Sequence, residues 1–203
     1  IVFYYFLIDL PSEKRKKEAK DRSEKVILFD SENVKAISFI KGENTITLKR
    51  LGTDEWQMTA PVNANGDVPA VSDFLSFLKN LNFTRVVEES PKDLTPFGLN
   101  TPSLKIILSM NNGETKGVRV GDDHPMGNKV YLARLNGSRV LTAGITKNRL
   151  DQEVHDLRDK TILDFETPQI TKIELIRNGK TLSLKKNEES WEVSEEKITA
   201  EGN

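Results

Sequence analysis

The sequence contains no cysteine and only two histidines, His124 and His155. Without cysteine the chain can form no disulfide, thiolate zinc site, iron–sulfur cluster or thiol nucleophile. Neither sign of charge is in excess, because 30 Lys and Arg stand against 31 Asp and Glu, giving a formal net charge of -1 at pH 7. This balance gives no electrostatic signal for nucleic acid, so no nucleic-acid partner is expected.

The usual enzyme signatures are also missing. We find no Walker loop, no Gly-x-Gly-x-x-Gly, no Gly-x-Ser-x-Gly and no His-Glu-x-x-His. His155 stands alone on a predicted helix without a Ser or Cys nucleophile context, so a catalytic role is not expected for it. The sequence therefore predicts a protein that is not an enzyme and has no catalytic residue, no cofactor and no metal.

No long hydrophobic run is present, and the longest apolar stretch opens the chain. Its eight apolar residues, Ile1 to Ile8, fall far short of the roughly 20 that span a bilayer. Tyr4, Tyr5 and Phe6 beside a charged stretch are typical of the interfacial end of a transmembrane helix. We interpret residues 1–10 as the tail of a truncated membrane anchor, with a short buried strand or helix as the alternative.

The next segment is strongly charged and has no large apolar side chain. Residues 12–25 hold seven basic and four acidic side chains. Their composition favours a solvated, helical spacer, and contact with anionic lipid is the alternative. We therefore assign residues 11–30 to a charged spacer.

What the sequence does contain is an internal repeat. Residues 34–50 align without a gap on residues 170–186, and the apolar positions coincide. The matched pairs are Val34 with Ile170, Ile37 with Ile173, Phe39 with Leu175, Ile46 with Leu182 and Leu48 with Leu184. After one residue of slippage Trp56 matches Trp191, and residues 64–67 then match 200–203. An offset of about 136 residues is too long for a solenoid and indicates duplication of a domain-sized unit.

Each copy is predicted to form a β-hairpin followed by a third strand that carries the tryptophan, with hairpin turns at 41–44 and 177–180. In the first copy Asp67 and Pro69 open a helix with apolar residues at i, i+3, i+4 and i+7. These residues are Val71, Phe74, Leu75 and Leu78. The second copy reaches Asn203 where such a helix would begin, so we expect the natural chain to continue and some apolar surface to lack its cover.

Between the copies the pattern is a run of short strands with one more helix. Strands are predicted at 103–110, 115–120, 129–135 and 138–143, with turn sequences between them. Leu150, Val154 and Leu157 mark the helix. Because no strand–helix–strand alternation occurs, we predict an α+β fold with a mainly antiparallel sheet and amphipathic helices.

This reading divides the chain into four parts. The tail of the anchor (1–10) and the spacer (11–30) come first. An α+β module follows at 31–165, and residues 166–203 are the beginning of a second, truncated module.

One loop and two aromatic residues are the candidates for function. Asp122, Asp123 and His124 lie together in the segment 121–128, which also includes Asn128. Carboxylates and an imidazole could bind a metal or transfer protons, but Gly, Asp, Pro and Asn are also typical of a tight turn. We interpret this segment as a turn that offers a possible contact surface. Trp56 and Trp191 are predicted to be structural core residues, with a ligand groove as the alternative.

Several short motifs resemble a known family. They are Trp56 followed by Pro61 and a helix, 96–99 (Pro-Phe-Gly-Leu) with Pro102, Val120-Gly121, 130–134 (Val-Tyr-Leu-Ala-Arg), and 156–160 (Asp-Leu-Arg-Asp-Lys) before Ile162-Leu163. In order and spacing the chain resembles the bacterial family known as the domain of unknown function 4340, over roughly residues 34–165 and 170–194.

The resemblance implies no enzymatic activity and no catalytic residues. It implies a bacterial cell-membrane protein with a single amino-terminal anchor and the bulk of the chain outside the cytoplasm. Members of the family are often encoded beside ABC-type export or gliding-motility-like transporter components. The expected function is a membrane-tethered accessory or scaffold protein of an ABC-type transporter or envelope complex. The alternatives are a module that binds a lipid, glycan or peptide in a groove between the duplicated units, and a metal-dependent hydrolase using residues 122–124.

Overall fold

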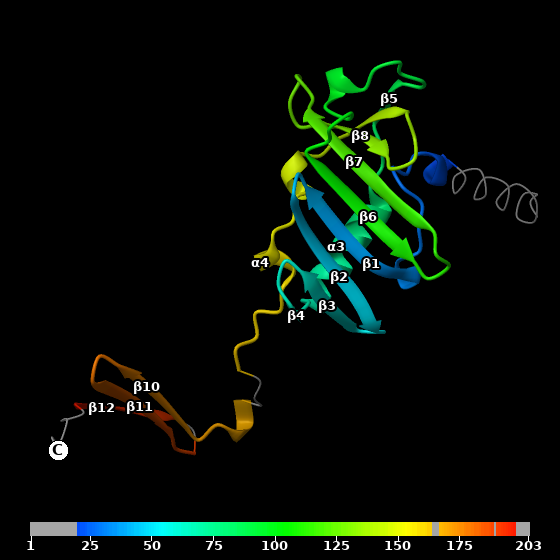
Figure 1. The fold of residues 1–203 in the computed structure, drawn as a ribbon. Coiled ribbons are helices and arrows are strands. Elements are labelled where there is room, and N and C mark those ends of the chain that lie inside the picture. Colours follow the sequence, from blue (N-terminus) through cyan, green and yellow to red (C-terminus); the bar gives the residue numbers. More distant parts are fainter. Residues whose placement is uncertain (1–19, 164–166, 189, 198–203) are drawn as a thin grey trace, which may run out of the picture. The chain divides into compact units, whose positions relative to one another are not determined.

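The computed structural model describes residues 20–163, 167–188 and 190–197. The chain divides into two compact units between Lys160 and Thr161 (Figure 1). The first unit contains a nine-stranded sheet and the second a three-stranded sheet, and every strand pairing is antiparallel. The predicted α+β class with a mainly antiparallel sheet is confirmed.

The sheet of the first unit runs in the order β4-β3-β2-β1-β6-β7-β8-β9-β5. Its strands are β1 (Val34–Lys41), β2 (Asn44–Gly52), β3 (Glu55–Ala60), β4 (Ala64–Asn65), β5 (Arg85–Glu88), β6 (Leu104–Met110), β7 (Thr115–Asp123), β8 (Val130–Arg134) and β9 (Val140–Ala143). Each predicted strand is present. The turn at 41–44 is confirmed, because Lys41 pairs with Asn44 at the end of the β1–β2 hairpin.

One face of this sheet is covered by helix α3 (Val68–Asn80). The side chain of Asp67 accepts a hydrogen bond from the backbone N–H of Ala70 at 3.0 Å, and Pro69 lies in the first turn, where no N–H is needed. The four apolar residues predicted to share a face are all buried, and Phe74 packs edge-on against Phe39 of β1 with ring centroids 5.0 Å apart. The predicted helix is therefore confirmed.

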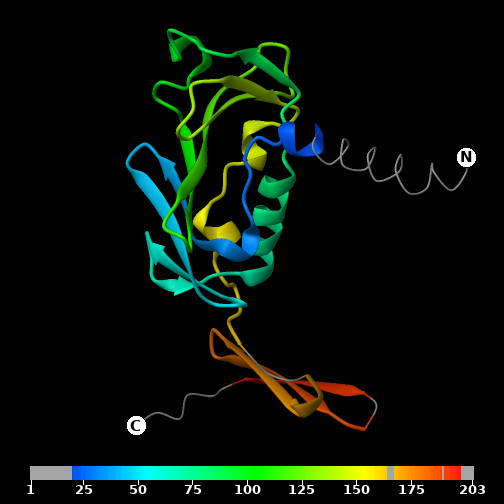
Figure 2. The same ribbon diagram turned by 90° about the vertical axis from the view of Figure 1, so that its right-hand side faces the viewer.

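Figure 2 shows α3, the segment of residues 20–33 and the segment before Lys160 on the same side of the sheet. The core between them draws its buried side chains from Val26 to Leu157. Val26 and Ile27, from the described part of the expected 11–30 spacer, are buried in this core. Arg134 fixes this segment, because its Nε donates a 2.9 Å hydrogen bond to the carbonyl of Val26.

The second predicted helix is much shorter than the spacing of Leu150, Val154 and Leu157 indicated. Helix α4 covers only Val154–Leu157, and Leu150 follows a separate 3-10 turn, η4 (Lys147–Arg149). The chain cannot continue helically between them because Glu153 is extended, with φ -103° and ψ 163°. Further 3-10 turns are η2 (Ser31–Asn33), η3 (Thr95–Phe97) and η5 (Thr167–Gln169).

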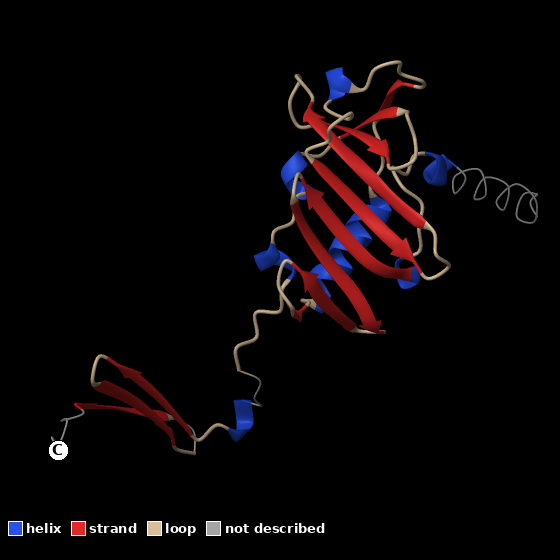
Figure 3. Cartoon of the chain, in the orientation of Figure 1, coloured by secondary structure: helices blue, strands red, loops and turns tan. Residues whose placement is uncertain are grey.

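The second unit is a small antiparallel sheet of β10 (Lys172–Arg177), β11 (Lys180–Lys186) and β12 (Trp191–Lys197) (Figure 3). Arg177 pairs with Lys180, which confirms the turn at 177–180. Several of its apolar side chains are exposed to solvent.

Among the residues that the structure describes, no helix is both long and apolar enough to cross a membrane. The expected anchor, residues 1–10, lies outside the described residues.

Candidate functional site

The segment 121–128 is only partly the turn that its composition predicted. Strand β7 continues through Asp122 and Asp123, and Asp123 pairs with Val130 of β8. Between Val120 and Asp123 the pairing register shifts, so that β7 holds one residue more than β8. This β-bulge keeps the two exposed aspartates in the strand, and the true turn is confined to residues 124–129.

The turn is closed by backbone hydrogen bonds around His124. Its N–H donates to the carbonyl of Lys129 at 2.9 Å, and its carbonyl accepts from Gly127 at 2.9 Å. Gly127 and Asn128 both have positive φ, 68° and 50°. Asn128 therefore adopts the left-handed backbone conformation that the turn requires. Met126 at the tip is 83 % exposed.

An aromatic row lies beside this turn. The ring of His124 is 5.1 Å from the ring of Tyr131, and Tyr131 is 5.2 Å from Phe97 in an edge-on arrangement. The Nδ1 atom of His124 accepts a 3.1 Å hydrogen bond from the N–H of Met126, so this nitrogen is an acceptor. The contacts hold the imidazole against a packed surface.

Two glycines allow the segment around Phe97 to approach the bulge. A Cβ atom on Gly121 would overlap the carbonyl oxygen of Phe97, and one on Gly98 would lie 2.5 Å from Cγ of Asp122. Gly98 also has a positive φ of 65°, which ends η3. These contacts join η3 to the end of β7, and sequence reasoning did not find them because the two segments are distant in the chain.

Potential metal ligands do not gather at this site or elsewhere in the described chain. Within residues 20–163, 167–188 and 190–197 no three side chains of His, Asp or Glu lie close enough together to hold a metal ion. The arrangement at the end of β7 and β8 is an exposed turn on an aromatic support, a geometry suited to contact with another surface.

A second candidate surface is the sheet face opposite α3, which Figure 1 views directly. Its central residues alternate with the core residues of three neighbouring strands and are only partly exposed. They are Ala36, Ser38 and Ile40 of β1, Thr45 and Thr47 of β2, and Lys105, Ile107 and Ser109 of β6. We call these eight residues the open face. Ser38 and Thr47 bridge its strands through a 3.0 Å hydroxyl hydrogen bond.

Five of the eight side chains of the open face are small, so another protein surface can lie close to its backbone. The open face is not evident from the sequence, because its alternating small and polar residues resemble those of any solvent-facing strand. Only the strand order, which brings β6 beside β1, assembles them into one area.

The two tryptophans lie at matching positions of their hairpins but differ in exposure. Trp56 pairs with Arg50 and is 2 % exposed, while Trp191 pairs with Lys186 and is 39 % exposed. The guanidinium of Arg50 lies 4.6 Å from the centre of the Trp56 ring. Trp56 therefore lies in the core of its unit, whereas Trp191 is partly exposed to solvent.

His155 lies in the short helix α4, and its backbone carbonyl is bound by Lys160. The Nζ of Lys160 donates to the carbonyl of His155 at 3.1 Å and to the carboxylate of Asp67 at 3.2 Å. The exposed imidazole of His155 lies next to Val154 on this single helical turn. These contacts link α4 to the start of α3.

A basic hollow lies near the N-terminal segment. Its volume is about 520 Å³, and its lining includes Arg22, Lys25, Lys79 and Lys116. Three of these cations are already engaged: Lys79 pairs with Asp30 at 3.4 Å, and Lys25 and Lys116 donate to backbone carbonyls. Asp30, which also lines the hollow, balances one of the four positive charges, while the bonds of Lys25 and Lys116 to carbonyls fix these side chains without neutralising them.

A family model described as a domain of unknown function, DUF4340, matches residues 56–203. No curated protein and no solved structure matches the chain.

Proposed function

This chain belongs to the family of the domain of unknown function DUF4340, and from that premise we propose that it is a non-enzymatic accessory or scaffold protein of an ABC-type transporter or envelope complex. In this proposal an amino-terminal anchor tethers it to the bacterial cell membrane, and the rest of the chain lies outside the cytoplasm. Support comes from the resemblance of its motifs to this family and from the apolar and charged segments that open the chain.

The observation that carries the proposal is the open face. It spans the centre of a nine-stranded sheet, where α3 and the core lie on the opposite side. Five of its eight side chains are small, and the other three are one lysine and two isoleucines, so it is neither strongly charged nor strongly apolar. Such a surface suits a protein contact that buries a wide area without a deep pocket. The turn at 124–129 and Met126 supply a second exposed contact point.

We further propose that the two units are copies of one ancestral unit. The paired residues of the β1–β2 hairpin and of the β10–β11 hairpin correspond one to one, as in Ile37 with Leu48 and Ile173 with Leu184. The third strands agree as well, since Arg50 pairs with Trp56 and Lys186 with Trp191. The sequence alignment and the strand register thus support the same correspondence, including the single residue of slippage before the tryptophans.

The test is to cross-link the protein mildly in its native membrane, isolate it, and identify by mass spectrometry the proteins that accompany it. The proposal expects ABC-type permease or ATPase subunits to be enriched. Isolation of the protein alone, or its release with the soluble fraction, would contradict the proposal.

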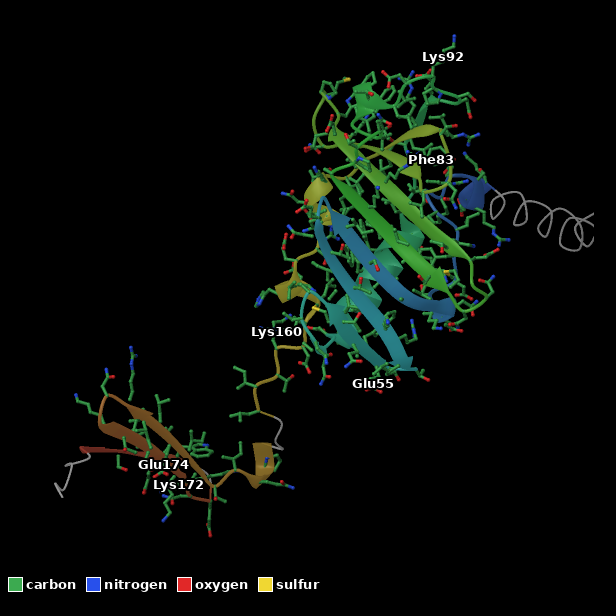
Figure 4. The ribbon with its side chains drawn as sticks, in the orientation of Figure 1. Glu55, Phe83, Lys92, Lys160, Lys172 and Glu174 are labelled. Carbon is green, nitrogen blue, oxygen red and sulfur yellow. The ribbon has the colours of Figure 1, made fainter. Side chains whose placement is uncertain are left out.

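A matched pair of variants locates the contact. Lys105→Glu reverses a charge on the open face, and Lys92→Glu reverses one on the exposed loop before η3 (Figure 4). Neither residue is buried, so both variants are expected to fold. Enrichment should fall with Lys105→Glu and persist with Lys92→Glu; equal enrichment in both would exclude the open face as the contact.

A further inference from the structure

The three-stranded sheet of the second unit has one apolar face that is exposed. Residues paired across antiparallel strands share a face, which places Ile173, Leu175, Leu182, Leu184 and Val193 together. We call these five residues the second apolar face. Leu175 is 59 % exposed and Val193 is 64 % exposed. The other face includes Lys172 and Glu174, which form a 2.6 Å ion pair (Figure 4). The sheet is amphipathic, and its apolar side lacks a cover within the described residues.

The corresponding face of the first unit is fully covered. Its residues at the matching positions are Ile37, Phe39, Leu48 and Met58, each at most 1 % exposed, and Ile46 at 7 %. Helix α3 provides the cover through Val71, Phe74, Leu75 and Leu78. Because the two hairpins have the same pairing register, the second apolar face presents its side chains in the same order across the strands.

The residues that lead into α3 also recur. Gly66 passes so close to the third strand that a Cβ atom on it would lie 2.9 Å from Cβ of Trp56, so glycine is required where the chain crosses this tryptophan. The sequence Ala200-Glu201-Gly202-Asn203 matches Ala64-Asn65-Gly66-Asp67 and keeps this glycine.

We propose that the second apolar face is the docking site of an amphipathic helix, which takes the place that α3 takes on the first sheet. This inference rests on the duplication in the proposed function and is independent of any transporter. The helix that fits this face has apolar residues at i, i+3, i+4 and i+7, which is the pattern of α3.

Because the chain has no cysteine, single thiols can report on the face. Leu175→Cys places a thiol on the second apolar face, and Ile176→Cys places one on the opposite face of the same strand. The two side chains have similar exposed fractions, 59 % and 65 %, which makes the second variant a matched control. The rate of maleimide labelling is measured in the 203-residue chain with and without a synthetic peptide of residues 67–81, which carries α3.

The peptide is expected to slow labelling at position 175 by about tenfold and to leave position 176 unchanged. A peptide with Phe74→Ser and Leu78→Ser is expected to have no effect, because its apolar stripe is interrupted. Protection at neither position, or equal protection at both, overturns the docking of an α3-like helix on this face.

The labelling results are independent of the cross-linking result, so failure of this inference and failure of the transporter proposal can be told apart.

Discussion

Gly121 shows how a single residue joins two distant segments. It is buried at the bulge of β7, and a Cβ atom at this position would overlap the carbonyl oxygen of Phe97. Because the obstacle is backbone, it cannot rotate away as a flexible side chain would. The contact between η3 and the end of β7 therefore requires glycine.

We expect Gly121→Ala to lower the free energy of unfolding by about 2 kcal/mol or more, since the backbone around Phe97 must shift. The measurement is urea denaturation followed by circular dichroism. Gly144→Ala is the control, because its new Cβ would meet only Cγ2 of Thr84, at 3.5 Å, and it should change stability little. Equal loss in both variants would contradict the steric explanation.

The charge of Lys41 is coupled to the fold. Burial lowers the pKa of its ammonium, but the hydrogen bonds and charges of Asp151 and Glu153 outweigh burial and raise the pKa above 10.5. The ammonium bonds both carboxylates, with Glu153 at 2.6 Å. These contacts connect the end of β1 to the segment that follows η4.

A raised folded-state pKa means that the stabilisation is complete below the unfolded pKa of the lysine and is lost as the pH rises through the folded pKa. We therefore expect Lys41→Met to reduce the free energy of unfolding by at most about 1 kcal/mol, since Glu153 is largely exposed. The difference between wild type and variant should be constant from pH 6 to about pH 9 and should shrink above about pH 10. A difference that grows with pH would show that folding lowers the pKa of Lys41 and does not raise it.

At the scale of elements, α3 depends on its cap. Asp67→Ala removes the bond to the N–H of Ala70 and should cost about 1 kcal/mol in thermal or urea unfolding. Asp67→Asn should retain most of the stability, because Asn also caps and only the ion pair with Lys160 loses its charge. Asp73→Ala, on the exposed side of the same helix, is the matched control and should be nearly neutral. Similar losses for Ala and Asn at position 67 would assign the effect to the ion pair.

Elements with strong local signals were predictable from the sequence. Helix α3 and the hairpins β1–β2 and β10–β11 follow from local periodicity and turn sequences. Strand β5 was missed because it has four residues, none buried, and pairs with β9, which lies far along the chain. The length of α4 was wrong because Asp151 and Glu153, which bind Lys41, lie between the apolar positions that suggested one helix.

The candidate site was less predictable for the same reason. The aspartates of 121–128 look like turn residues, yet pairing with β8 keeps them in a strand. The support of His124 by Tyr131 and Phe97 depends on η3, whose position no local pattern reveals.

At the scale of the whole molecule, the core of the first unit is self-sufficient. Every buried hydrophobic residue among the described residues lies between Val26 and Leu157. Ending the chain after Lys160 therefore removes no buried apolar residue that the structure describes. It also removes Trp191, which leaves Trp56 as the single tryptophan.

We expect a chain of residues 1–160 to unfold at the same urea concentration as the full chain when Trp56 fluorescence is followed in a Trp191→Phe background. A lower midpoint in the shorter chain would show that the second unit stabilises the first. The isolated three-stranded sheet, with its apolar face exposed, should by contrast be marginally stable.

The short strands at the two edges of the nine-stranded sheet limit how this protein can bind other proteins. One border strand, β4, has only two residues, and the other, β5, has four. Borders this short offer few free backbone N–H and C=O groups, so an additional strand from a neighbour would gain little by pairing there. The first unit is thereby protected from sheet extension and fibre formation. A partner of the first unit would therefore have to contact side chains on the faces of the sheet and not the backbone at its edges.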